Sequence, residues 1–346
     1  HPYIHSLNSI LEILYQLKDL FVIEYLSDMI GYGQRDIILK PITTKPILYA
    51  GMMVKNEERD LPDLLKSIEN VVDGLVVLDT GSTDKTMEIA LNFKKIDTCR
   101  TYLEASEKNE LNDWQLWNFS MPRNEYIRII ETYPIVTWML TLDADDTLLN
   151  PEKLRRLVYL DCIDVFSIKL APDLFLQHRM WKIRKGVKFV GAVHEYPTIE
   201  NLRVLDTDIK ILHNYAPGIG ENSNARNLRI LLKEHNTNPS NRNTFYLAQT
   251  YRDGSKYKEA IEYYTKYINM PIVYRDEWLF AHLYKARCER IINPDTAIYS
   301  LYTGISENNN WAEFWMELCY IYYDRKDYSR SLGCSQMATS CPILPT

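Results

Sequence analysis

The chain has 346 residues, and its 46% hydrophobic and 25% charged residues are typical of a globular protein with a sizeable core. Its net charge of −6 argues against a surface that binds nucleic acid, because such a surface needs an excess of basic residues. No apolar run approaches the ~20 residues that span a bilayer. The six cysteines form no CxxC pair, so we expect free thiols and a cytoplasmic location.

Apolar residues recur at helical spacing between residues 6 and 30, which predicts an amphipathic helix. Gly31 and Gly33 would end this helix, and a proline-bounded link over residues 41–46 follows it. We expect this N-terminal segment, residues 1–45, to pack against the next domain. A seam between the two copies of a homodimer is the alternative.

Strand-like and helical segments then alternate along the chain. The pattern predicts helices at 61–71, 85–93 and 123–132, and strands at 47–54, 74–78, 98–103 and 135–142. Such alternation with short links implies right-handed crossovers and a mainly parallel sheet flanked by helices, which is an α/β fold. Ligands of these sheets bind beyond the carboxyl ends of the strands.

Three polar clusters follow these strands, where a ligand is expected. They are residues 55–57, 79–84 and 143–146. In the last cluster Asp143, Asp145 and Asp146 end an apolar strand, a position where packing does not call for carboxylates. Mg²⁺ and Mn²⁺ prefer such oxygen ligands. Taken alone, each cluster could be an ordinary turn or a helix cap.

In this order, the motifs resemble the nucleotide-sugar-binding signature of family 2 glycosyltransferases with the GT-A fold, which is Rossmann-like. The similarity lies in residues 54–57, 78–84 and 142–145, in a Phe-Ser-x-x-Arg segment at 119–123, in 191–195 and in 213–215. The chain departs from this pattern at Asp146, where a bacterial-type subgroup usually has Glu, and at Ala216, where glycine is usual.

The resemblance implies a glycosyltransferase that uses a nucleoside-diphosphate sugar, with uridine diphosphate as the expected carrier. The donor-binding residues would be Val54, Asn56, Glu57, Asp79, Arg123, Asp143 and Ala144. Asp145 and His213 would bind Mn²⁺ or Mg²⁺, which stabilises the charge of the departing diphosphate. A protein, peptide or glycan acceptor would displace the nucleotide in line, with inversion. Arg123 could instead make a surface ion pair, and His213 could be structural.

Transfer to an acceptor also needs a base near the attacking atom. Glu195 is our first candidate and Asp173 our second. The alternative for Glu195 is an ion pair with Arg184 or Lys188. Trp181 could stack on a sugar ring and so help to bind the donor, or it could pack in the core.

The last third of the chain has a repeated helical pattern. Four residues recur at an offset of 71, namely Leu247, Tyr251, Tyr257 and Ala260 as Leu318, Tyr322, Tyr328 and Ser331. A weaker copy, with Leu283 and Ala297, lies between them. Half of this offset is close to the ~34-residue period of tetratricopeptide repeats, which predicts about three helical hairpins. We therefore expect a catalytic domain over 46–235 and an all-α repeat region over 236–346.

Two other functions fit parts of the sequence. Asp143 and Asp145 match the Asp-x-Asp-x-Thr loop of haloacid-dehalogenase-type phosphatases. That fold also needs a later Gly-Asp-x-x-x-Asp loop, which the sequence lacks, and it would leave the clusters at 55–57 and 79–84 unexplained. The other alternative is an inactive scaffold whose repeats bind a partner. The intact acids argue against it.

Overall fold

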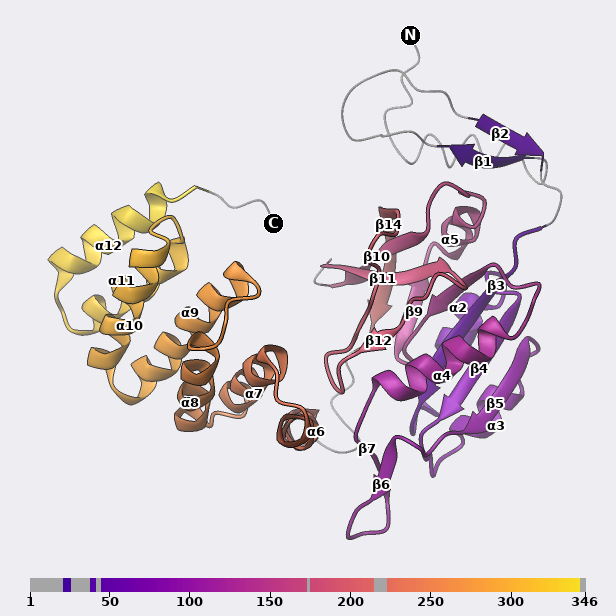
Figure 1. Ribbon diagram of the computed structural model, residues 1–346, viewed down its shortest axis with the longest axis horizontal. Coiled ribbons are helices and arrows are strands. Elements are labelled where there is room, and N and C mark those ends of the chain that lie inside the picture. The colour runs from indigo at the N-terminus through magenta and orange to yellow at the C-terminus, as the bar shows by residue number, and fades with distance from the viewer. Residues whose placement is uncertain (1–20, 26–37, 42–44, 173–174, 215–222, 343–346) are drawn as a thin grey trace. The chain divides into compact units, whose positions relative to one another are not determined.

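The computed structural model describes residues 21–25, 38–41, 45–172, 175–214 and 223–342 (Figure 1). The chain divides into two compact units, His1–Pro217 and Gly218–Thr346. Near the N-terminus, β1 (Phe21–Tyr25) pairs antiparallel with β2 (Ile38–Pro41). The predicted helix over residues 6–30 is therefore wrong at residues 21–25, where aromatic and β-branched residues favour a strand. The rest of that prediction lies outside the described residues.

An eight-stranded sheet forms the first unit, in the order β5-β4-β3-β8-β11-β10-β14-β9. Its strands are β3 (Leu48–Val54), β4 (Gly74–Asp79), β5 (Ile96–Thr101), β8 (Trp138–Thr141), β9 (Asp146–Leu149), β10 (Val165–Ala171), β11 (Phe175–Lys182) and β14 (Val204–His213). The neighbours β5, β4, β3 and β8 are parallel, which confirms the predicted arrangement. Beyond β8 the sheet is mixed, because β11 runs antiparallel to β8 and β10, and β9 runs antiparallel to β14.

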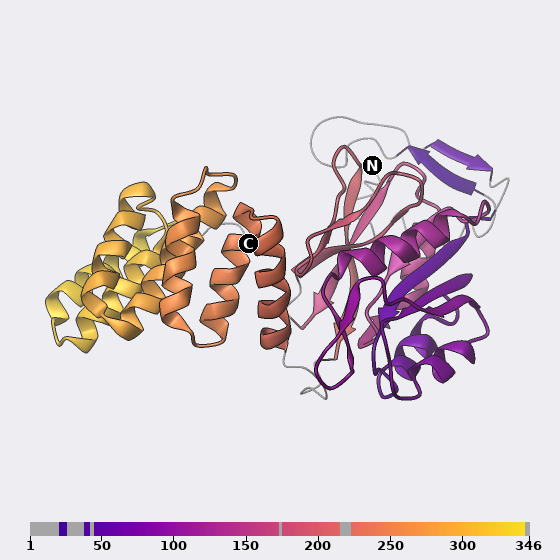
Figure 2. The same cartoon turned by 60° about the horizontal axis from the view of Figure 1, so that its bottom comes forward.

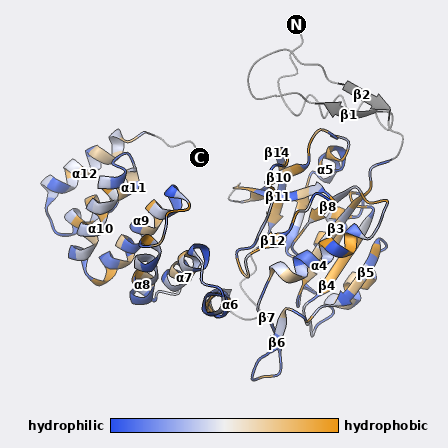
Figure 3. Cartoon of the chain, in the orientation of Figure 1, coloured by the Kyte–Doolittle hydropathy of each residue, from blue (hydrophilic) through white to orange (hydrophobic). Residues whose placement is uncertain are grey.

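Helices cover both faces of this sheet (Figure 1). They are α2 (Leu61–Ile68), α3 (Thr86–Leu91), α4 (Ser120–Glu131) and α5 (Pro151–Leu157). Apolar residues of α2 and α5 share one core with the sheet, and those of α4 belong to a second core. β4 is buried along its whole length, and its residues are apolar up to the final Asp79 (Figure 3). The unit therefore has the predicted α/β fold.

The sequence of α2 shows why a helix forms there. A proline in the first turn has the φ angle of a helix, and its missing N–H is not needed at that position. Asp63 lies in the first turn and Lys66 in the last, so both charges suit the helix dipole. Leu61, Leu64 and Ile68 recur on one face and are fully buried.

Two short hairpins complete the first unit. β6 (Ser106–Lys108) pairs with β7 (Trp114–Leu116), and β12 (Phe189–Val190) pairs with β13 (Tyr196–Pro197). The second of these hairpins encloses the loop that carries Glu195.

The second unit is helical and contains three hairpins, as the sequence predicts (Figure 2). After α6 (Ser223–Thr237) come α7 (Asn241–Asp253) with α8 (Tyr257–Ile268), α9 (Arg275–Ile292) with α10 (Pro294–Glu307), and α11 (Ala312–Asp324) with α12 (Tyr328–Ser340). The recurring Leu247, Leu283 and Leu318 are all buried in these hairpins. The unit includes α6, so it begins before residue 236, where we expect the repeat region to start.

Within the described residues, no helix combines the length and the apolar character needed to span a bilayer. All six cysteines are free thiols, as predicted.

Candidate functional site

The three polar clusters leave the sheet at the same edge. β4, β3 and β8 are parallel neighbours, so the loops that follow them start side by side. Hydrogen bonds of Asn56 join the first two loops. The Asn56 backbone N–H donates to Ser82 Oγ at 2.9 Å, and Asn56 Oδ1 accepts from the Thr83 N–H at 2.8 Å. Asn56 has a left-handed φ of 57°, a conformation that asparagine tolerates better than most residues.

The acids of these two loops differ in their surroundings. Asp79 is 3% exposed, and its carboxylate accepts hydrogen bonds from the Gly81 and Ser82 N–H groups at 3.1–3.2 Å. Burial, followed by the charge of Asp145, raises the pKa of Glu57 to about 7. Glu57 therefore feels the charge of the third cluster. Its own loop is held to the start of α3, where Thr86 Oγ1 accepts from the Glu57 N–H at 2.7 Å.

The third cluster is a tight turn between β8 and β9. The Asp146 N–H donates to the Asp143 carbonyl at 3.0 Å, and Asp146 Oδ2 accepts from the Asp143 N–H at 2.8 Å. Asp146 is only 1% exposed, because it is the first residue of β9 and faces the core. The backbone of this turn is therefore fixed by one of its own carboxylates.

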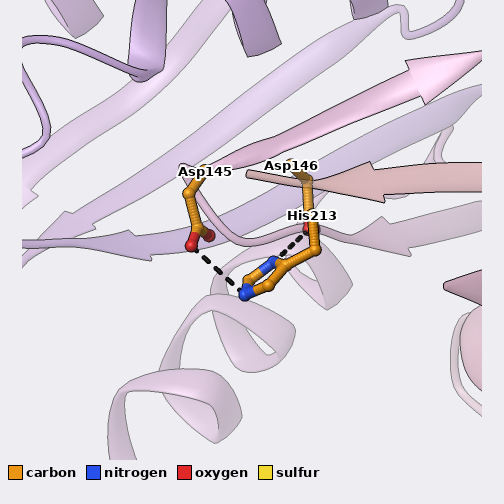
Figure 4. Close-up of side chains that lie close together, drawn as sticks. All are labelled: Asp145, Asp146 and His213. Carbon is orange, nitrogen blue, oxygen red and sulfur yellow. Dashed lines mark hydrogen bonds and ion pairs between the residues drawn. The ribbon is translucent and has the colours of Figure 1, made fainter. Parts of the chain in front are cut away.

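Asp145, Asp146 and His213 form a group that could hold a metal ion (Figure 4). One ligand atom from each residue lies within 4.8 Å of the others. The antiparallel pairing of β9 with β14 places His213 opposite Asp146. His213 Nδ1 lies 3.0 Å from Asp146 Oδ1, and its Nε2 lies 3.3 Å from Asp145 Oδ2. The ring therefore joins two of the three carboxylates.

The charges of this group perturb one another. Burial raises the pKa of Asp145 to about 6, and Asp143 and Asp146 add to this effect although His213 opposes it. The hydrogen bond to Asp146 raises the pKa of His213. A concentration of carboxylates at one strand end is what a hard cation would neutralise.

Arg123 on α4 is buried and fully engaged. Its Nε lies 2.6 Å from Glu195 Oε1, and its Nη2 lies 2.8 Å from Asp143 Oδ1. Nη1 contacts the Tyr126 hydroxyl at 3.3 Å. The surface ion pair considered for Arg123 is therefore wrong, because the side chain is 9% exposed and bridges two elements. Glu195 does form an ion pair, as the alternative to its role as a base supposed, but its partner is Arg123 and not Arg184 or Lys188.

Arg179 on β11 belongs to this site, and sequence reasoning missed it. Its Nη1 lies 2.9 Å from Asp143 Oδ2 and 3.6 Å from Asp146 Oδ2. Burial alone would raise the pKa of Asp143, but the charges of Arg123 and Arg179 outweigh it and hold the pKa well below its usual range. Asp146 was also not predicted as a member of the metal group. The run of three carboxylates was the signal for it.

Four other residues were predicted to belong to the site, and the structure bears on them differently. Trp181 is 1% exposed and packs against Phe189 with ring centroids 6.0 Å apart, so the predicted stacking on a sugar is wrong and the core alternative holds. Val54 and Ala144 are buried, and the Val54 carbonyl accepts hydrogen bonds from Thr80. Donor binding by these two residues stays a prediction. Asp173 lies outside the described residues.

Comparisons with known proteins bear on the function. No family model matches the chain. The SPbeta prophage-derived glycosyltransferase SunS of Bacillus subtilis (strain 168) is 25% identical over 321 residues, which cover 87% of this chain and 70% of SunS. This similarity supports a glycosyltransferase.

A second relative in sequence and one solved structure also match the chain. A TPR repeat-containing protein of Synechococcus elongatus is 38% identical over 98 residues, 28% of this chain and 20% of that protein. This match supports TPR-like repeats in the chain. A crystal structure of S. aureus TarS aligns with a TM-score of 0.36 and 12% identity, over 86% of this chain and 93% of that one.

Proposed function

We propose that this chain is a divalent-cation-dependent glycosyltransferase, of the family 2 type, that uses a nucleoside-diphosphate sugar. The observation that carries the proposal is the Asp145–Asp146–His213 group at the carboxyl edge of a sheet whose neighbouring tips carry Glu57 and Asp79. The similarity to a glycosyltransferase over most of the chain supports the same conclusion.

The donor atoms of this group fit Mn²⁺ or Mg²⁺. Carboxylate oxygens suit both ions, and imidazole is an acceptable ligand for Mn²⁺. A histidine that binds a metal usually gives its other ring nitrogen to a carboxylate, which fixes the ring. Asp146 fits that second role, since it contacts His213 Nδ1 at 3.0 Å while Nε2 faces Asp145. We therefore assign Asp145 and His213 as the residues that would hold the ion. When bound, the ion would stabilise the charge of the leaving diphosphate.

The donor would lie across the tips of β4, β3 and β8. Glu57 and Asp79 would accept hydrogen bonds from the base and the ribose, with uridine diphosphate as the expected carrier. Asn56 would shape this pocket by holding the two loops together, since both its backbone N–H and its Oδ1 are used for that purpose. Asp143 would reach the donor only at its exposed edge, because each of its oxygens already meets an arginine.

Transfer would proceed by in-line displacement with inversion. The acceptor hydroxyl or thiol would form a bond to the anomeric carbon while the bond to the diphosphate oxygen breaks, and the diphosphate would leave with the electron pair. Glu195 is the proposed base for the acceptor proton, and Asp173 is the second candidate. Arg123 would orient Glu195 through their contact at 2.6 Å. A polypeptide or a glycan is the proposed acceptor class.

The test is a thermal-shift screen of sugar nucleotides in the presence and absence of Mn²⁺, followed by an assay of nucleoside diphosphate release. A ligand present at 100 times its dissociation constant stabilises the folded chain by about 2.7 kcal/mol. We expect one sugar nucleotide to give a shift that needs Mn²⁺, and Asp145→Ala to abolish that shift. Asp208→Ala is the matched control, because Asp208 is also an aspartate of this unit but lies exposed on β14, paired with Lys153 at 3.4 Å.

Adding p-nitrophenyl phosphate as a second substrate separates the glycosyltransferase from the phosphatase and the scaffold. A haloacid-dehalogenase-type phosphatase would cleave p-nitrophenyl phosphate, and a scaffold would neither cleave it nor release nucleoside diphosphate. The phosphatase is disfavoured because its nucleophile would be Asp143, whose two oxygens are held by Arg123 and Arg179. A Mn²⁺-dependent shift that survives in Asp145→Ala would contradict the metal assignment.

A further inference from the structure

Arg179 occupies an irregular position in its strand. β11 pairs with β10 so that Met180 faces Phe166 and His178 faces Ser167, which leaves Arg179 as an extra residue between them. One extra residue in one strand of an antiparallel pair is a β-bulge, a feature that redirects a side chain and recurs next to active sites. Here the bulge lies in the strand that pairs with β8, the strand from which the acidic turn emerges.

The redirected side chain reaches two carboxylates of the turn. Arg179 Nη1 lies 2.9 Å from Asp143 Oδ2 and 3.6 Å from Asp146 Oδ2. Its Nε donates to Gln177 Oε1 at 2.8 Å, so the guanidinium plane is fixed from its own strand as well. The side chain is 8% exposed. A buried arginine in this position cannot turn away to solvent.

We infer that Arg179 is a positioning residue for the cation site, an inference that rests on the proposed function. It touches neither Asp145 nor His213 in the contacts of the described residues, so it acts through Asp143 and Asp146. Three carboxylates within one short turn repel each other, and two opposing guanidinium charges remove most of that repulsion. Arg123 and Arg179 pair with Asp143, Asp146 and Glu195. Asp145 is left as the carboxylate whose charge the cation balances.

Arg179 also fixes the geometry of the histidine. Asp146 contacts Arg179 with Oδ2 and His213 with Oδ1, so the orientation of one contact constrains the other. Replacing a residue that supports a metal ligand in this way typically lowers metal affinity 10–100-fold. We expect a loss of about this size when the guanidinium is removed.

The experiment measures Mn²⁺ affinity of the whole chain with Mn²⁺ as the only added ligand, by the electron paramagnetic resonance signal of free Mn²⁺. Arg179→Met should bind Mn²⁺ about 10–100-fold more weakly than the unmodified chain. Arg179→Lys should recover part of the affinity, because it restores the charge but not the planar fork. Arg155→Met is the matched control, since Arg155 is a shielded arginine that pairs with Asp73 at 2.7 Å, next to the starts of β3 and β4. Its affinity should stay within about twofold of the unmodified chain.

The outcomes separate this inference from the proposed function. If the unmodified chain binds Mn²⁺ and Arg179→Met binds it equally well, the positioning role is overturned and the proposed function stands. If the unmodified chain binds no Mn²⁺, both are overturned. Should Arg179→Met fail to fold by circular dichroism, Arg179→Lys decides, because full affinity in that variant would show that the fork is not needed.

Discussion

The two units of this protein treat buried polar groups in different ways. In the first unit, the buried Arg123 and Arg179 both meet carboxylates from other elements, at one edge of the sheet. In the second unit, several buried polar atoms have no hydrogen-bond partner among the described residues, whereas in the first unit Ser106 Oγ is an example of such an atom away from this edge. Tyr264 Oη, His282 Nε2 and Trp311 Nε1 are examples, and their rings pack against other aromatic rings.

This difference bears on the roles of the buried polar groups in the two units. Replacing a buried ion pair by apolar residues is often neutral or stabilising, so a connected network of such pairs is poor evidence for stability and better evidence for a site. Aromatic rings with an unused polar tip are explained by the area that they bury. The buried ion pairs of the first unit therefore fit the proposed donor site at this sheet edge, whereas the rings of the second unit are explained by packing between helices.

The largest expected effect concerns the proposed base. Glu195→Gln keeps the size of the side chain but cannot accept a proton, so the transfer rate should fall by about 10²–10⁴-fold. Mn²⁺ affinity should not change, because Glu195 contacts Arg123 and not the metal group. Steady-state release of nucleoside diphosphate measures the rate, and Glu200→Gln, at an exposed position a few residues away, is the control. A rate within about threefold of the unmodified chain would remove Glu195 as the base.

A second substitution compares a buried arginine with an exposed one on the same helix. Arg123→Met leaves Asp143 and Glu195 without their shared partner, and breaking a buried ion pair costs about 3–5 kcal/mol of unfolding free energy. Arg128→Met removes an exposed pair with Glu125 and should cost much less unfolding free energy, because solvent screens that pair. Urea denaturation measures both. Equal losses would show that the network around Arg123 is not held as we describe.

The half of the sheet that could be predicted from the sequence is the parallel half. Its strands and helices are local patterns of apolar residues, and the edge that carries the polar clusters follows from parallel pairing. The position of β11 between β8 and β10 could not be predicted, because β11 follows β10 after a short connection and the local apolar pattern does not show that its other edge pairs with β8. Arg179 was missed because its side chain is redirected by a bulge in the β10–β11 pair, and no local pattern of apolar residues indicates such a bulge.

The error at Trp181 has a related cause. A tryptophan could stack on a sugar ring or pack in the core, and the sequence does not show which face of which strand Trp181 occupies. In the structure Trp181 pairs across the sheet with Met139 and is covered on the face where α4 packs. The repeat region was easier to predict, because its hairpins are local and their buried residues recur at a constant offset.

A smaller loss of stability, caused by His282 in the second unit, should appear as the pH falls. Burial, with some help from Lys285, lowers the pKa of His282 to about 4, below the value of about 6.5 expected in the unfolded chain. Between these two values the unfolded chain binds more protons, so stability is lost as the pH falls from about 6.5 towards 4. We expect His282 to lower the free energy of unfolding by about 2 kcal/mol between pH 7 and pH 5. Urea denaturation at several pH values measures this loss. In His282→Phe the unfolding free energy should fall less between pH 7 and pH 5, and an equal fall in the variant would contradict the assignment.

The smallest expected effect concerns the N-cap of α7, a local contribution to stability that involves no buried charge. Ser240 precedes α7, and its side chain accepts a hydrogen bond from the Asn243 N–H at 3.2 Å. Ser240→Ala removes this cap and should cost about 1 kcal/mol, whereas Ser240→Asn should cost little, because asparagine caps as well as serine. Thermal or urea unfolding measures the difference. If both variants lose the same stability, the loss comes from packing around residue 240, and the helices of the second unit depend on tertiary contacts more than on their own ends.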